Sequence, residues 1–440
     1  MLLRKTIRQS LRLLVILLLP AFTMAQVTTS SISGKVITAS GATLQGATVK
    51  AVHIPSGTIY NTITRENGLF DLQGLRTGGP YQLEVSYVGM IPQKVEDITL
   101  RLGETYDMTI DMQDQATNNQ DVVVQAQVRK GASLKTGANT IITTKQLTAL
   151  PTISRSITDF TRLTPQANGN SFGGRDGRYN NLQVDGANLN NNFGLSNDLT
   201  PGGGSPISID ALSEVSVNIA PYDVRQSGFT GAGINVVTKS GTNEFHGTAY
   251  GLYRNQDFYG YKVDGEELTK TPNKNTVVGA SISGPIIKNK LFFFVNFEKE
   301  KSSIPGITYV ADGSKNSGNP SSTTLADLKT VHDFVQDKYG YDVGAYDNFP
   351  NFENKNTKFL AKIDWNINNG NKLTAKYTSY SGYEVSQLNG SSVPQNGDIY
   401  VTGQPKLIKR MPNNRFSNKS MAFSNSNYQT NHIVQTGSLE

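Results

Sequence analysis

The sequence has no cysteine among its 440 residues. This excludes disulfide bonds, thiolate zinc sites, cysteine nucleophiles and an acylated cysteine as a lipoprotein anchor. A strong charge of one sign is also missing. The formal charge of +6 includes four basic residues and no acidic ones at positions 1–25, which leaves +2 for the rest. We therefore expect no nucleic-acid partner, because such a chain offers a polyanion little electrostatic attraction.

A long apolar run is missing as well. The stretch Leu13–Leu19 is too short to span a bilayer, which takes about 20 residues. It follows four basic residues and precedes the small-x-small sequence Thr23-Met24-Ala25. This order predicts a signal peptide at residues 1–25, cleaved before Gln26. An N-terminal membrane anchor is the alternative, and no helical membrane span is expected after it.

What the sequence does contain is a clean alternation of apolar and polar residues in its later third. Side chains alternate between the two faces of a strand, so residues 358–366 form one apolar and one polar face. The apolar side holds Phe359, Ala361, Ile363 and Trp365, and the polar side holds Lys358, Lys362, Asp364 and Asn366, with Leu360 as the exception. Residues 372–378 repeat the pattern. It predicts strands of a transmembrane β-barrel, and the alternative is a soluble sheet with one solvated face.

The connections between these segments favour the barrel. Short turns at residues 288–290 and 368–371 alternate with long polar loops at about 301–356 and 382–426. Outer-membrane barrels have short periplasmic turns and long external loops. We expect about six crossings, and the large plugged barrels have about 22 strands. An open sheet edge cannot lie in lipid, so we expect the chain to be an N-terminal fragment. The expected crossings are Glu244–Arg254, Asn275–Ile286, Leu291–Glu300, Thr357–Ile367, Lys372–Tyr380 and a last one from Tyr428.

Residues 26–113 read as a separate β-sandwich of short strands punctuated by glycine, asparagine and proline. Four segments resemble the carboxypeptidase-regulatory-like domain, a transthyretin-like fold: Ser33–Val36, Gly46–Val49, Glu66–Phe70 and Val85–Gly89. The four histidines lack the H-x-x-E pairing that zinc carboxypeptidases use, because Ser56, Ala249, Val335 and Gln435 stand three positions after them. We expect a binding or spacer module, with no metal, no cofactor and no catalytic residue.

A polar linker at residues 114–141 contains one apolar patch. The patch consists of Asp121, Val122, Val123, Val124, Gln125 and Ala126. An isolated extended segment can add itself as a strand to the sheet edge of a partner. The patch resembles the energy-coupling box of TonB-dependent receptors, with Gln125 as a mild departure. A stray apolar patch in a linker is the alternative.

Residues 142–239 resemble the α+β plug domain of the same receptors, and residues 240–440 resemble part of their barrel. The segments that carry the resemblance are Tyr179–Gly186, Ile209–Val217, Gly228–Asn243 and Gly284–Phe294. They are most similar to the Oar-like branch, which carries the same N-terminal sandwich. Charged residues of the plug, at 175, 176, 178 and 185, are expected to hold it in the barrel rather than form an active site. The glycine-rich loop at 201–206 is a candidate for ligand contact.

The fold class expected is therefore mainly β: an N-terminal sandwich, a plug, and the first strands of a truncated transmembrane barrel. The resemblance implies a Gram-negative outer-membrane transporter with a periplasmic N-terminal domain, not an enzyme. Its implied partners are TonB, outer-membrane lipid and an unidentified transported ligand, and a lipoprotein partner is left open. The alternative from another class is a surface-exposed β-domain adhesin or carbohydrate-binding protein.

Overall fold

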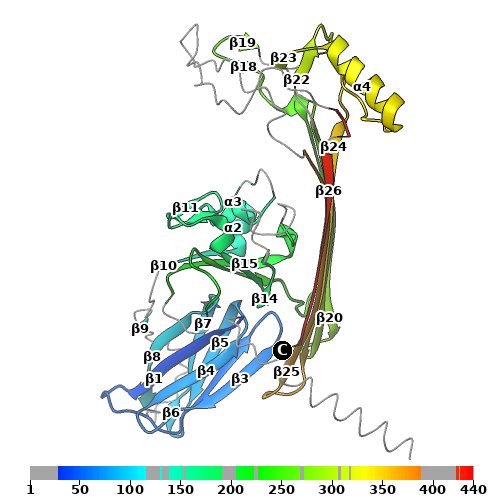
Figure 1. Cartoon of the computed structure of the whole chain (residues 1–440). Coiled ribbons are helices and arrows are strands. Elements are labelled where there is room, and N and C mark those ends of the chain that lie inside the picture. The colour runs from blue at the N-terminus through cyan, green and yellow to red at the C-terminus, as the bar shows by residue number, and fades with distance from the viewer. Residues whose placement is uncertain are drawn as a thin grey trace, which may run out of the picture.

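The structure is a computed structural model. It describes residues 28–114, 129–130, 138–150, 152, 155–190, 205–221, 226–267, 272–305, 309–316, 319–387, 423–425 and 427–439. Three β-sheet bodies follow one another along the chain (Figure 1). We call them the N-terminal sandwich (28–114), the middle domain (138–238) and the wall sheet (the six long strands after residue 245). No helix among these residues is long and apolar enough to cross a membrane.

The N-terminal sandwich packs two sheets around one apolar core. One sheet has the order β4-β1-β8-β6, with β9 beside β8, and the other has the order β3-β2-β5-β7. Alternate residues of β1 are buried, including Ile32 and Val36, which lie in a core with Phe70 and Tyr81. The strands are β1 (Ser30–Thr38), β2 (Thr48–His53), β3 (Thr58–Ile63), β4 (Leu69–Leu75), β5 (Gly78–Ser86), β6 (Met90–Ile91), β7 (Gln93–Leu100), β8 (Thr105–Asp114) and β9 (Arg129–Lys130).

The middle domain is a small mixed sheet with short helices on it. Its strand order is β10-β15-β16-β13-β14, and only the β13–β16 pair is parallel. Its strands are β10 (Ala138–Thr143), β11 (Ala167–Asn168), β12 (Ser171–Phe172), β13 (Asn181–Val184), β14 (Ala187–Asn188), β15 (Leu212–Ile219) and β16 (Gly233–Thr238). Its helices are α2 (Thr144–Ala149), α3 (Thr158–Thr161), η2 (Gly177–Tyr179) and η3 (Ile209–Ala211).

The wall sheet is an antiparallel meander in chain order. Its strands are β17 (His246–Asn255), β20 (Lys274–Ile287), β21 (Leu291–Pro305), β24 (Asn351–Asn366), β25 (Lys372–Gln387) and β26 (Asn427–Leu439). The short turns lie at the end nearest the sandwich, and the long connections lie at the opposite end (Figure 1). Those connections carry η4 (Gln256–Phe258), β18 (Lys262–Val263), β19 (Glu266–Glu267), β22 (Tyr309–Asp312), β23 (Asn319–Thr324) and α4 (Leu325–Tyr339). β17 and β26 are the edges, so the sheet is open.

Two features of the wall differ from the sequence expectation. The β21–β24 ladder runs on to Pro305 and Asn351, past the crossing ends expected at Glu300 and Thr357. The residues of this extension are mostly polar, with Ile304 and Phe352 as exceptions, so the alternation is lost while the backbone pairing continues. The polar loop expected at 301–356 also contains the 15-residue helix α4. A capping box between Thr324 and Asp327 and a left-handed Gly340 (φ 64°) define the two ends of α4.

Candidate functional site: the polar seam of the wall sheet

The two faces of the wall sheet are inverted relative to those of a soluble sheet. On β24 the polar residues are buried: Lys358 is 3% exposed and Asp364 is 2% exposed. The apolar residues of the opposite face are open, with Ile363 46% and Trp365 40% exposed. The buried polar face lies against the middle domain and the sandwich, and we call this contact the seam. Apolar residues on the other face are suited to lipid, as the alternation predicted.

One group of seam contacts centres on the carboxylate of Glu298 on β21. Lys358 Nζ lies 2.7 Å from Glu298 Oε1, and Arg155 of the middle domain lies 3.2 Å from Oε2. Ser208 Oγ and Tyr250 Oη both donate to Oε2, at 2.9 and 2.5 Å. Arg155 and Ser208 belong to the middle domain, whereas the other three residues belong to the wall. A buried carboxylate is tolerated here because it is paired and fully hydrogen-bonded.

Strand register explains how the wall side of this group assembles. Tyr250, Gly279, Glu298 and Lys358 lie opposite one another on four adjacent strands. The Tyr250 ring occupies the space where a Cβ atom on residue 279 would lie. Because residue 279 is glycine, the Tyr250 side chain can pass over strand β20 and reach Glu298 on β21. The guanidinium of Arg155 lies over the same ring, 4.7 Å from its centroid.

A second group centres on Asp185 of the middle domain. Asp185 has φ 40° at the Asp-Gly turn after β13, which directs its carboxylate toward the wall. It accepts hydrogen bonds from Thr238 N at 2.7 Å and Thr238 Oγ1 at 2.5 Å, and Lys376 Nζ lies 3.4 Å from Oδ2. Burial alone would raise the pKa of Asp185, but Lys362, Lys376 and Thr238 hold it below its usual value. Asp185 is therefore ionised at neutral pH.

Apolar contacts also cross the seam at the one residue that breaks the alternation. Leu360 is 1% exposed and packs, with Phe294 of β21, into the core of the middle domain. Leu360, the exception in the sequence pattern, is thus a side chain that faces the middle domain instead of water. The neighbouring outward residues Phe359 and Ala361 are not part of that core.

The N-terminal sandwich touches the short-turn end of the wall. Arg76 of the sandwich lies 3.3 Å from Asp364 Oδ1, and Asn366 Nδ2 donates to Thr58 Oγ1 at 2.9 Å. At Gly57 a Cβ atom would collide with the side chain of Asn289, in the turn between β20 and β21. The left-handed φ of 61° at Gly57 also suits glycine. These contacts join the sandwich directly to the wall, 308 residues away along the chain.

The sandwich contacts the middle domain as well. Leu102 N donates to Glu214 Oε1 on β15 at 3.0 Å, and Glu214 is 4% exposed. Burial raises the pKa of Glu214 to about 7. The nearby Glu104 acts in the same direction. Glu214 is therefore a buried titratable carboxyl at the interface between the two domains.

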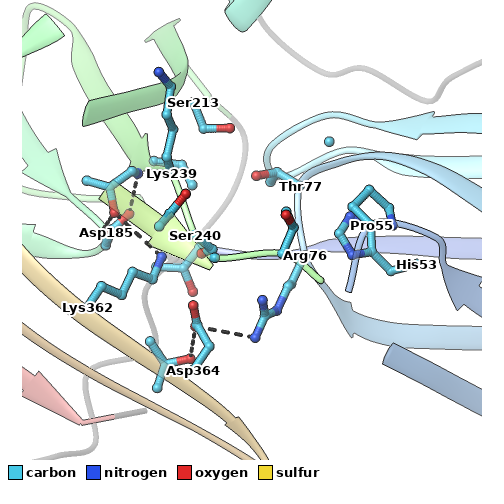
Figure 2. A pocket seen from close by; sticks show the side chains of 18 of the residues that line it. His53, Pro55, Arg76, Thr77, Asp185, Ser213, Lys239, Ser240, Lys362 and Asp364 are labelled. Atoms are coloured by element: carbon cyan, nitrogen blue, oxygen red, sulfur yellow. Dashed lines mark hydrogen bonds and ion pairs between the residues drawn. The ribbon is translucent and has the colours of Figure 1, made fainter. Parts of the chain in front are cut away.

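A cavity of about 510 Å³ lies where the three bodies meet. Figure 2 shows His53, Arg76 and Thr77 of the sandwich on one side, with Asp185, Lys239, Lys362 and Asp364 opposite. Burial and the nearby Arg76 and Lys372 lower the pKa of His53 to about 4, so it is neutral at pH 7. No group of three histidine, aspartate or glutamate side chains suited to a metal occurs among the described residues. Charged and hydroxyl-bearing side chains from all three bodies line the cavity.

The structure brings together some of the residues singled out from the sequence. Asp185 faces the wall, whereas Asp176 and Arg178 pair with each other at 2.9 Å on the exposed surface. The box at Asp121–Ala126 and residues 201–204 of the glycine-rich loop lie outside the described residues. Sequence reasoning missed Arg155 and Glu298. The alternation of β21 held a signal for Glu298, because it stands on the inward face with Phe292, Phe294 and Asn296.

Comparison with known proteins gives two family matches in separate parts of the chain. Residues 31–113 match the carboxypeptidase regulatory-like domain, and residues 237–340 match an outer membrane beta barrel domain. Similar curated proteins include the TonB-dependent transporter Oar of Myxococcus xanthus, 32% identical over 155 residues. This match covers 33% of this chain and 14% of Oar.

A second relative is PirA of Acinetobacter baumannii, described as a probable TonB-dependent siderophore receptor. It is 28% identical over 184 residues, which cover 37% of this chain and 23% of PirA. The chain therefore matches less than a quarter of either relative's length. Neither description is that of an enzyme, as expected from the sequence.

Solved structures with some similarity include PirA from Acinetobacter baumannii and the outer membrane transporter YddB from Escherichia coli. PirA superimposes with a TM-score of 0.36 at 19% identity, covering 57% of this chain and 32% of PirA. YddB gives 0.38 at 16% identity, covering 59% and 34%. The two domain matches and the similarity to Oar show a carboxypeptidase regulatory-like domain and part of an outer membrane β-barrel in this chain, and they support a TonB-dependent receptor of the Oar type.

Proposed function

We propose that the protein takes up a ligand across the outer membrane, with residues 142–239 as a displaceable plug and Asp121–Ala126 as the segment that pairs with TonB. The ligand binds from the side of the long connections. On the periplasmic side, where the sandwich lies, the box pairs with TonB as an added strand. The force that TonB then exerts on the box shifts the plug. No covalent chemistry takes part in this cycle.

The observation that supports this proposal most directly is the polar seam. Apart from Leu360, Phe294 and Val434, the described wall residues that meet the middle domain are largely charged or hydrogen-bonding groups. When such an interface separates in a water-filled lumen, water can solvate each charge, whereas separated apolar surface stays exposed at a large penalty. Polar interdomain interfaces of this kind allow relative motion. The seam therefore suits a plug whose position in the barrel is fixed by specific ion pairs and hydrogen bonds, and which can still separate from the wall.

The coupling step is tested without knowing the ligand. A photoreactive benzoylphenylalanine at Gln125 of the full-length protein should form an adduct with TonB in cells. Val123→Pro should abolish the adduct, because proline removes a main-chain donor from the added strand. Val123→Ala is the matched control and should keep it, since main-chain pairing is unchanged.

The same photoreactive residue at Val88, 95% exposed on the sandwich, is the positional control. If position 125 gives no more TonB adduct than position 88, the coupling role of the box is wrong. Because PirA is described as a siderophore receptor, ferric chelates are the first ligands to test in growth assays, followed by glycans and peptides. A lipoprotein partner stays a prediction that purification from native membranes can test.

A further inference from the structure

The outward face of the wall changes character partway along the strands. From the short turns up to Phe297 on β21 and Phe359 on β24, this face is apolar. The next outward positions on β21 are Lys299 and Lys301. Lys301 pairs in register with Lys355 of β24, and Lys274 of β20 lies opposite Ser303 of β21. Four lysines thus share one face across three adjacent strands, directly beyond the apolar band.

Most of this positive charge is uncompensated. Glu353 binds two of the lysines, with Lys301 Nζ at 2.7 Å and Lys355 Nζ at 3.0 Å. Within the described part of the chain, Lys274 and Lys299 have no carboxylate partner. Lys274 instead lies over the ring of Tyr253, 5.4 Å from its centroid. Surface lysines this close to one another repel, so an anion placed between them is stabilised.

Three of the four lysines border a cavity of about 400 Å³ on the wall. Lys274, Lys299 and Lys301 line it together with Ser303 and Glu353, and Thr276 and Val278 line the side toward the apolar band. Val278 is 55% exposed. The cavity therefore offers ammonium and hydroxyl groups at one end and apolar surface at the other. That is the order of groups along a phosphorylated lipid.

We propose that this lysine cluster binds the phosphate headgroup of a lipid in the outer leaflet, with an acyl chain lying along Val278. The assignment rests on the orientation in the proposed function, which places the long connections outside. A soluble phosphate would contact the lysines but leave the apolar end of the cavity unfilled. A lipid fills both ends and continues over the exposed apolar face below.

The test uses the full-length receptor and two double variants that each remove two positive charges. Lys274→Gln with Lys299→Gln alters the cluster, and Lys288→Gln with Lys290→Gln alters the exposed short turn of the same hairpin. Binding of diphosphoryl lipid A to protein in phosphatidylcholine nanodiscs is measured by native mass spectrometry, with dephosphorylated lipid A and excess inorganic phosphate as further probes. Each lysine near an anionic membrane surface strengthens binding about fivefold, so the cluster variant should bind roughly 25-fold more weakly. The turn variant should match the parent protein.

Several outcomes would overturn the assignment. Equal binding by both variants, or equal binding of dephosphorylated lipid, removes the phosphate site. Full displacement by inorganic phosphate makes a soluble anion the ligand. Lipid A recovered with protein purified from cells tests orientation separately. If that recovery falls only in the turn variant while nanodisc binding depends on the cluster, the proposed orientation fails and the cluster does not face the outer leaflet. Loss of lipid A only in the cluster variant, in both assays, supports the site.

Discussion

At the scale of single residues, Glu298 shows how a charge can be kept in a buried interface. It has one ammonium partner, one guanidinium partner and two hydroxyl donors, and its side chain is 1% exposed. Removing such a charge leaves its cationic partners buried and uncompensated, which is more harmful than losing the attraction itself. In exposed pairs such as Glu353 with Lys301, water solvates both side chains, so the pair contributes little to the free energy of unfolding.

Glu298→Gln should therefore loosen the middle domain in the full-length receptor. Glutamine keeps the size, but its amide nitrogen cannot accept a hydrogen bond, so one of the two acceptor oxygens is lost and Lys358 and Arg155 are left without a counter-charge. We expect a loss of about 3–5 kcal/mol in the free energy of unfolding of this domain. Urea titration, followed by proteolysis of the middle domain, measures it. Glu353→Gln removes the same charge from the exposed pair and should leave the urea midpoint unchanged. Equal midpoints for both variants would show that Glu298 does not hold the domain.

At the scale of elements, each wall strand joins two different surroundings. β24 presents Lys358, Leu360, Lys362 and Asp364 to protein, and presents its alternate residues outward. The alternation predicted this division, and Leu360 is explained only by the middle domain packed against it. Where outward residues turn from apolar to lysine, the lipid band ends while the hydrogen-bonded ladder continues.

A photoreactive benzoylphenylalanine at Ile363 should crosslink to lipid acyl chains in membranes containing the full-length protein. The same residue at Asp364, one position along the strand, should not, because side-chain direction reverses at each step. Mass spectrometry of the labelled tryptic peptides detects the adducts. Lipid adducts at both positions, or at neither, would contradict the assignment of the two faces.

At the scale of the whole molecule, the sandwich, middle domain and wall form a mutually contacting set. The sandwich reaches the wall through Arg76 and Thr58, and reaches the middle domain through Leu102. These contacts place it at the short-turn end, where it lines part of the cavity shared by the three bodies. The absence of cysteine makes this arrangement open to a clean crosslinking test.

Thr58→Cys together with Asn366→Cys should form a disulfide on mild oxidation. Asn366 Nδ2 and Thr58 Oγ1 lie 2.9 Å apart in the native protein, so the γ positions that the two sulfur atoms would occupy are close neighbours and a small rearrangement can join them. A mobility shift on non-reducing gels, reversed by a reductant, reports the bond. Thr58→Cys with Ser379→Cys is the control and should not shift, since Ser379 lies on the outward face. If the first pair stays reduced in folded protein, the sandwich does not dock at the short-turn end.

Much of the architecture follows from the sequence alone. Local periodicity predicted the alternation in β24 and β25, the contrast of short turns with long loops, and the glycine-punctuated strands before residue 114. Backbone geometry converts such a period directly into strands with two distinct faces. The resemblance to TonB-dependent receptors of the Oar type is confirmed by the domain matches and by Oar. Helix α4 was missed because it stands inside a long polar connection, although Leu325, Leu328, Val331 and Val335 recur at a spacing that suits a helix.

The partners across the seam were decided by tertiary structure. Glu298 meets Arg155 across 143 residues, and Thr58 meets Asn366 across 308. No local pattern encodes such pairs, because they depend on how the three sheet bodies dock against one another. The lysine cluster has the same origin: its members are scattered along three strands and meet only through strand register. Sequence periodicity determined which face of each strand is polar, and only docking and register decided what that face binds.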